Sequence, residues 1–95
     1  MIQSFKHKGL RRLFEKGDAR GLQPDQVNRI DLLLDALHNA ESVDDLNLPG
    51  FGLHPLKGNR KNEPVVWAVK VNANDRITFE FEEGDAFHVN YIDYH

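Results

Sequence analysis

Residues 67–91, with the sequence WAVKVNANDRITFEFEEGDAFHVNY, decide the fold because apolar and polar residues alternate along them. The alternation is clearest in residues 77–82, ITFEFE, and a period of two residues is typical of a β-strand with one buried face. Turn-forming residues interrupt it at 72–75, NAND, and at 83–85, EGD. The segment therefore predicts three consecutive antiparallel strands joined by tight turns. Beyond residues 77–82, the predicted core face carries Trp67, Val69, Val71, Phe87, Val89 and Tyr91.

Upstream of this segment the apolar residues recur every three or four positions, which predicts two helices. The first covers residues 8–16 and stops at Gly17, a residue type that favours helix ends. The second begins near Pro24, follows an apolar stripe through residues 27–37 and ends near Asn39. Its polar side, which we expect to face solvent, carries Arg29, Asp31 and Asp35.

Two extended segments complete the predicted fold. Residues 2–5 alternate in polarity and indicate a short edge strand, and Pro55 keeps residues 53–56 extended. We therefore predict a single α+β domain over residues 1–95 with the element order βααβββ. In this arrangement two antiparallel N-terminal helices pack on a twisted, mainly antiparallel sheet.

The composition limits where such a protein works. The chain has 95 residues and no cysteine, which excludes disulfides and thiolate metal sites. No leader sequence is recognisable at the N-terminus, and the longest apolar run, residues 65–69, is too short to span a bilayer. We expect a soluble cytoplasmic protein without membrane contact.

The net charge of −3 hides an uneven distribution. Residues 1–20 contain six basic and two acidic residues, residues 57–61 contain three basic ones, and acidic residues dominate from Glu63 onward. A negative net charge argues against a nucleic-acid partner, whereas the basic N-terminal part would suit one. Charge alone therefore identifies no partner, and an ordinary mixed surface is the simpler interpretation.

Polar residues that suit RNA cleavage lie near the ends of the predicted strands. Cleavage without a metal needs a base for the 2′-hydroxyl, an acid for the 5′-oxygen and cations for the phosphate. Histidine serves both proton roles because its unperturbed pKa is about 6.5, and lysine and arginine bind phosphate. The candidate residues are His54, Lys57, Asn72, Asn74, Arg76, Asp93, Tyr94 and His95.

Other candidate side chains have simpler structural explanations. His88 falls opposite the predicted core face, so we expect it to face solvent. His7 and His38 are assigned to helix surfaces, and Trp67 is expected in the core rather than as a platform for stacking bases.

Taken together, four stretches of the chain resemble the HigB toxins of the RelE/ParE superfamily, also known as plasmid-maintenance killer proteins. These stretches are IQSF through KGL (2–10), DLNLPG (45–50), LHPLKG (53–58) and RITF through DYH (76–95). LHPLKG and the terminal DYH are the most specific of them. The four stretches follow the family's order and span nearly the whole chain.

The resemblance implies a RelE-like fold and a ribosome-dependent mRNA endonuclease. Toxins of this family cut mRNA in the A site of the 30S subunit by 2′-hydroxyl attack, with neither metal nor cofactor. A helix-turn-helix antitoxin of the HigA type holds them inactive, and DNA is contacted only through that antitoxin. The resemblance therefore implies three partners: antitoxin, ribosome and mRNA.

The same resemblance assigns seven residues to the site. The catalytic residues are His54, Asp93, Tyr94 and His95, and the RNA- or phosphate-binding residues are Lys57, Asn74 and Arg76. The two histidines transfer protons in an order that the sequence leaves open. The terminal aspartate orients the neighbouring histidine, and the tyrosine contacts the scissile nucleotide.

Two acidic residues depart from the family's pattern. Asp75 stands where tryptophan is usual, and Glu80 stands where a basic residue is usual. A carboxylate beside Arg76 is expected to weaken its attraction for phosphate. Two alternatives stay open: a ParE-like toxin that inhibits DNA gyrase, and a catalytically weak toxin that acts mainly as antitoxin partner and co-repressor. The two histidines and Lys57 favour the nuclease.

Overall fold

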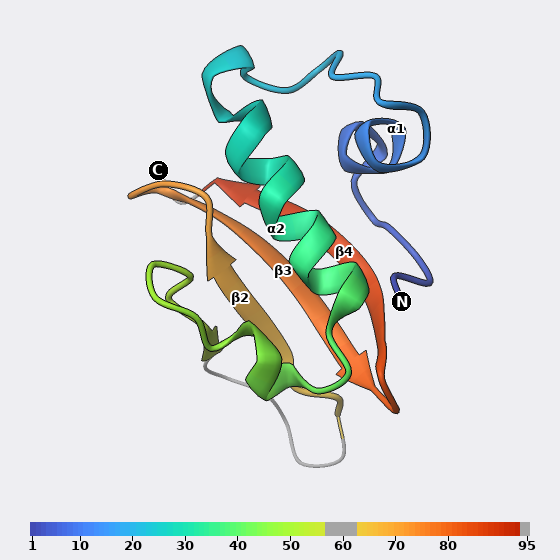
Figure 1. The fold of residues 1–95 in the computed structure, drawn as a ribbon, viewed down its shortest axis with the longest axis vertical. Coiled ribbons are helices and arrows are strands. Elements are labelled where there is room, and N and C mark those ends of the chain that lie inside the picture. Colours follow the sequence, from blue (N-terminus) through green and yellow to red (C-terminus); the bar gives the residue numbers. More distant parts are fainter. Residues whose placement is uncertain (57–62, 94–95) are drawn as a thin grey trace.

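The computed structural model describes residues 1–56 and 63–93, which form two helices and a four-stranded sheet (Figure 1). The predicted α+β class is confirmed. The helices are α1 (Lys8–Lys16) and α2 (Val27–Asn39), accompanied by the 3₁₀ turns η1 (Pro24–Gln26) and η2 (Val43–Leu46). The strands are β1 (His54–Pro55), β2 (Val66–Lys70), β3 (Asp75–Glu82) and β4 (Asp85–Asp93).

The sheet has the strand order β1-β2-β3-β4, and every neighbouring pair is antiparallel. The chain reverses between β2 and β3 at residues 71–74 and between β3 and β4 at Glu83-Gly84. Both residues of the second turn have positive φ, at 51° and 82°, as a two-residue turn that matches strand twist requires. Both hairpins lie where the alternation predicted them.

The N-terminal segment corrects one part of the predicted order. Ile2 and Phe5 form isolated parallel bridges to Ala86 and Val89 of β4, but they form no regular strand. The ladder is broken because β4 is irregular between these two contacts. The fourth strand of the sheet is instead β1, which pairs with β2 through His54 and Pro55.

A β-bulge in β4 corrects the predicted core face of that strand. The pairing with β3 shifts by one residue between Thr78 and Glu80, and His88 adopts a positive φ of 55°. Because one extra residue reverses the alternation, Ala86 is fully buried and Phe87 turns to the other face of the sheet, where it pairs with Glu80. His88 faces solvent as predicted.

The helices cover one face of the sheet, and neither of them packs on the opposite face. α2 lies across the sheet, and Figure 1 shows α1 nearly end-on beside it, so the helices cross steeply and do not run antiparallel as predicted. The long connection through residues 17–26 permits this crossing. The core joins both helices to the sheet and includes Leu10, Leu13, Ile30, Leu33, Leu34, Leu37, Val69, Ile77, Phe79 and Val89.

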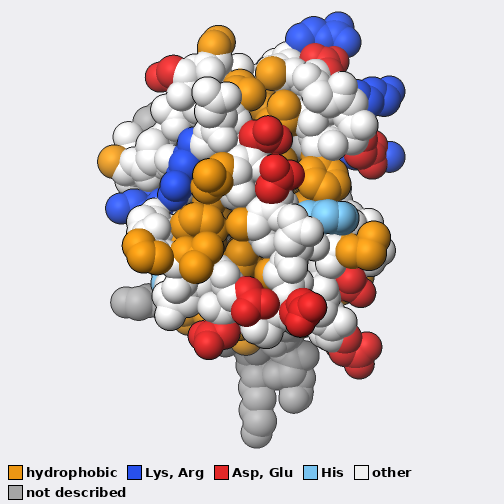
Figure 2. All heavy atoms as spheres, in the orientation of Figure 1, with side chains coloured by type: hydrophobic (Ala, Val, Ile, Leu, Met, Phe, Trp, Pro, Cys, Tyr) orange, Lys and Arg blue, Asp and Glu red, His pale blue; other side chains and the backbone are white. Residues whose placement is uncertain are grey.

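The charge distribution of this helix-bearing face follows the sequence. Figure 2 shows a group of carboxylates toward the lower end of the view, where η2 and the β3–β4 turn lie, and others nearer its middle and α1. Lysines and arginines lie on the α1 side and also at the left of the view, and none is visible at the lower end. In the ranges that the structure describes, no helix is long and apolar enough to cross a bilayer.

His7 is a capping residue rather than a simple surface residue. Its Nδ1 accepts a hydrogen bond from the backbone N–H of Leu10 at 3.2 Å, which satisfies a free donor at the start of α1. A Cβ on Gly9 would lie 2.9 Å from His7 Cε1, so the glycine leaves room for the ring. Burial, and then the charge of Arg12, lower the pKa of His7.

This cap predicts a pH dependence of stability. Because the pKa of His7 is lower in the folded than in the unfolded chain, the unfolded chain binds more protons just below the unperturbed value of 6.5. The free energy of unfolding should therefore rise with pH through that window, and the contribution is complete above it and lost as the pH falls. The variant His7→Asn keeps a capping acceptor that does not titrate, so its urea midpoint should change less with pH. Equal slopes for the two proteins would contradict the assignment.

Candidate active site

His54 lies exposed at the start of β1, with one ring nitrogen held by the chain itself. Its Nδ1 is 2.8 Å from the carbonyl oxygen of Gly52. Since a carbonyl only accepts hydrogen bonds, Nδ1 must carry the proton, and in the neutral ring Nε2 then keeps its lone pair. The sequence-predicted histidine therefore presents an exposed nitrogen that is able to accept a proton.

Arg29 fixes the loop that precedes His54. Its guanidinium donates to the carbonyl oxygen of Gly50 at 2.7 Å and to that of Lys70 at 2.9 and 3.2 Å, and it lies 5.4 Å from the centre of the Phe51 ring. The backbone N–H of Lys70 donates to the carbonyl oxygen of Phe51 at 2.7 Å. Sequence reasoning placed Arg29 on a solvent face, because its partners lie 21 and 41 residues away and no local signal connects them.

The β2–β3 hairpin carries Arg76 and Asn74. Arg76 Nη1 donates to the carbonyl oxygens of Asn72, Asp75 and Ala73 at 2.7, 3.0 and 3.3 Å. The Asn72 side chain accepts from the backbone N–H groups of Asn74 and Asp75 at 2.9 and 2.8 Å. The turn is thus internally braced, and Asn74 lies exposed at its tip beside the arginine.

Asp75 points away from Arg76, toward the helix-bearing face. It is 7% exposed and accepts hydrogen bonds from the Tyr91 hydroxyl and from Asn72 Nδ2. Burial raises the pKa of Tyr91, and the hydrogen bond to Asp75 raises it further. This departure from the family's pattern therefore has a structural role in the hairpin. The other departure, Glu80, lies 3.7 Å from His88.

The sheet register brings His54 and Arg76 to one face. His54 pairs with Ala68, Lys70 pairs with Arg76, and residues two apart on β2 share a face. With strands about 4.8 Å apart and residues about 3.3 Å apart, the two α-carbons are separated by roughly 12 Å, a span that long side chains and a nucleotide bridge. This face is opposite the one that the helices cover.

The remaining predicted site residues do not all join this face. Asp93 pairs with Asp75, so strand alternation places it on the helix side of the sheet, opposite Arg76. Lys57, Tyr94 and His95 lie outside the described residues. Among the described residues, no group of three His, Asp or Glu side chains is arranged to hold a metal ion.

Comparison with known proteins identifies the family. Residues 3–95 match the family model described as the RelE-like toxin of the type II toxin–antitoxin system HigB. The chain belongs to the HigB-like toxin family. It is also 50% identical over 95 residues to the Endoribonuclease HigB of Proteus vulgaris, and the alignment covers all of both chains.

Membership of the HigB-like toxins confirms the family predicted from LHPLKG and the terminal DYH. A type II toxin has an antitoxin as its partner, so the HigB-like chain is one half of a pair. The fold agrees with this membership, since two helices on an antiparallel sheet are consistent with RelE-like toxins.

Proposed function

We propose that this HigB-like toxin is an endoribonuclease that cleaves mRNA in the ribosomal A site and thereby arrests translation. Its family and its relationship to the Endoribonuclease HigB of Proteus vulgaris support a nuclease. The observation that carries the proposal is His54, whose exposed Nε2 lies on the same sheet face as Arg76. A proton acceptor and a cation on one face are what cleavage of a phosphodiester by its own 2′-hydroxyl requires.

In the proposed reaction, the 2′-oxygen attacks the adjacent phosphorus while a base removes its proton. The bond from phosphorus to the 5′-oxygen breaks, and an acid protonates that oxygen, which leaves a 2′,3′-cyclic phosphate and a 5′-hydroxyl. His54 Nε2 is suited to take the first proton, and we assign the second proton to His95. No metal ion takes part in these steps.

The other residues would bind and orient the RNA. Lys57 and Arg76 stabilise the phosphate charge that develops in the transition state, and Asn74 contacts the RNA from the hairpin tip. Asp93 and Tyr94 belong to the proposed site through the family pattern, as the orienting carboxylate and as a contact to the scissile nucleotide.

The proposed setting is the cytoplasm of a bacterial cell, where ribosomes and mRNA meet. A HigA-type helix-turn-helix antitoxin would hold the toxin inactive, and the toxin would reach DNA only through that antitoxin. No membrane takes part.

The test is a cleavage assay on end-labelled mRNA with and without programmed ribosomes. We expect cleavage only with ribosomes, at the A-site codon, with cyclic phosphate ends. With a phosphorothioate at the scissile position, rescue by Mn²⁺ would contradict metal independence. Inhibition of gyrase supercoiling without mRNA cleavage would replace the proposal by a ParE-like activity. If expression of the toxin without its antitoxin leaves growth unchanged, the result would favour a catalytically weak toxin that acts mainly as antitoxin partner and co-repressor.

A further inference from the structure

A second surface feature lies at the end of the sheet opposite the β2–β3 hairpin that carries Arg76. It is a shallow groove of about 890 Å³ between η2, the start of β2 and the far end of the β3–β4 hairpin. Glu82, at its border, lies six residues along β3 from Arg76, or about 20 Å at 3.3 Å per residue. The groove is therefore separate from the hairpin end of the proposed RNA site.

The walls of the groove are apolar and partly aromatic. Trp67, Phe81 and Phe87 line it, together with Val43 and Val65. Val65 is 42% exposed, and Phe87 is displaced from the core by the bulge at His88. Apolar side chains in a hollow that opens to water favour a partner that covers them.

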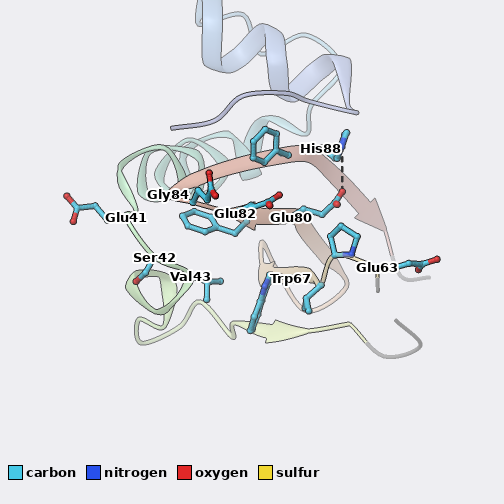
Figure 3. A pocket seen from close by; sticks show the side chains of 14 residues that line it. Glu41, Ser42, Val43, Glu63, Trp67, Glu80, Glu82, Gly84 and His88 are labelled. Carbon is cyan, nitrogen blue, oxygen red and sulfur yellow. Dashed lines mark ion pairs between the residues drawn. The ribbon is translucent and has the colours of Figure 1, made fainter. Parts of the chain in front are cut away.

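The rim of the groove is acidic. Figure 3 shows Glu41 and Glu63 at its two ends and the carboxylates of Glu80 and Glu82 between them. Glu83 adds a fifth carboxylate, and none of the described lining residues is lysine or arginine. His88 lies 3.7 Å from Glu80 and offsets part of that one charge only when protonated. This rim repels RNA and attracts a basic partner.

We propose that this groove docks a basic, amphipathic segment of the antitoxin. Apolar side chains of that segment cover Trp67, Phe87 and Val65, and its lysines or arginines pair with the glutamates of the rim. The identity of the partner rests on the toxin–antitoxin family, and the growth readout below also rests on the proposed function. Docking here places the antitoxin away from the hairpin that carries Arg76.

The test compares antitoxin affinity for matched charge variants of the full chain by titration calorimetry. The groove variant is Glu63→Gln/Glu82→Gln, and the control, Asp31→Asn/Asp35→Asn, removes two charges from α2 that are exposed as well. The partner is the full-length antitoxin from the neighbouring gene. We expect the groove variant to weaken binding about tenfold at low salt, which corresponds to about 1.4 kcal/mol, and the control to bind like the wild type. Val65→Ser should also weaken binding.

A second readout locates the contact directly. Trp67 is the single tryptophan of this chain, so its fluorescence reports on the groove. With the antitoxin tryptophans replaced by phenylalanine, binding should shift the emission maximum of Trp67 and protect its fluorescence from a soluble quencher. An unchanged emission on binding would overturn the proposal, as would equal affinities of the groove and control variants. Circular dichroism melts check that the variants fold.

Two further outcomes would assign the groove to another partner and overturn the proposal. One is a groove variant that loses ribosome binding but keeps antitoxin affinity. The other is sedimentation of the wild type as a dimer and of the groove variant as a monomer, which would indicate that a second copy of the chain occupies the groove. Growth separates this proposal from the proposed function. The groove variant should still arrest growth, but the antitoxin should no longer neutralise it. If the wild-type chain does not arrest growth, only the proposed function is contradicted, because the measured antitoxin affinities still test the docking proposal.

Discussion

Replacing His54 by glutamine is expected to lower the rate of ribosome-programmed mRNA cleavage by about 10²–10⁴-fold, the usual contribution of a positioned acid or base. Glutamine keeps a polar side chain of similar reach but cannot take up the 2′-hydroxyl proton at neutral pH. Because His54 is exposed and its ring bonds to the carbonyl oxygen of Gly52, two residues before it, the loss should appear without a change in thermal stability. Single-turnover cleavage of labelled mRNA measures the effect.

The matched control is His88→Asn, which removes another exposed histidine from the same sheet. Asparagine tolerates the positive φ at this position. His88 contacts Glu80, four residues along β3 from Arg76 and away from the hairpin, so cleavage should be unchanged. The double variant His54→Gln/His95→Gln should abolish growth arrest in cells that lack the antitoxin. Full toxicity of the double variant would refute the proton-transfer assignment.

Local patterns predicted most of the fold because they reflect burial on one face. The alternation in residues 77–82 and the apolar stripe of α2 each correspond to an element in the structure. The predicted orientation of Phe87 toward the core is wrong because the bulge at His88 inserts one residue into β4. No turn-forming residue marks that bulge in the sequence. The steep crossing of the helices likewise depends on packing between residues far apart in the chain.

The candidate site was predicted through motifs rather than through physical patterns. The motif LHPLKG predicted His54 as a site residue, and the strand pairing in the structure places it on the same face as Arg76. The role of Arg29 depends on carbonyl oxygens that only the fold brings to it. The orientation of Asp75 follows from strand alternation, but its partner Tyr91 becomes evident only from the pairing of Tyr91 with Ile77 on the neighbouring strand.

Replacing Asp75 by alanine is expected to destabilise the toxin by about 1–3 kcal/mol, because buried donors would lose their acceptor. The Tyr91 hydroxyl and Asn72 Nδ2 both donate to this carboxylate. For a domain of this size, a loss of 1 kcal/mol lowers the melting temperature by about 4–8 °C. Asp75→Asn keeps one acceptor oxygen and should cost less. Thermal melts of the purified chain without antitoxin measure both.

A double-mutant cycle with Tyr91→Phe tests whether the hydroxyl and the carboxylate act as a pair. If they do, the double variant should lose less stability than the two single variants together, by at least about 0.5 kcal/mol. Additive losses would show that Asp75 stabilises the hairpin without its bond to the Tyr91 hydroxyl. Cleavage activity adds a second criterion: if Asp75 braced the turn and also weakened phosphate binding, Asp75→Asn would cleave faster than the wild type. Because the carboxylate faces Tyr91 on the side away from Arg76, we expect no such gain.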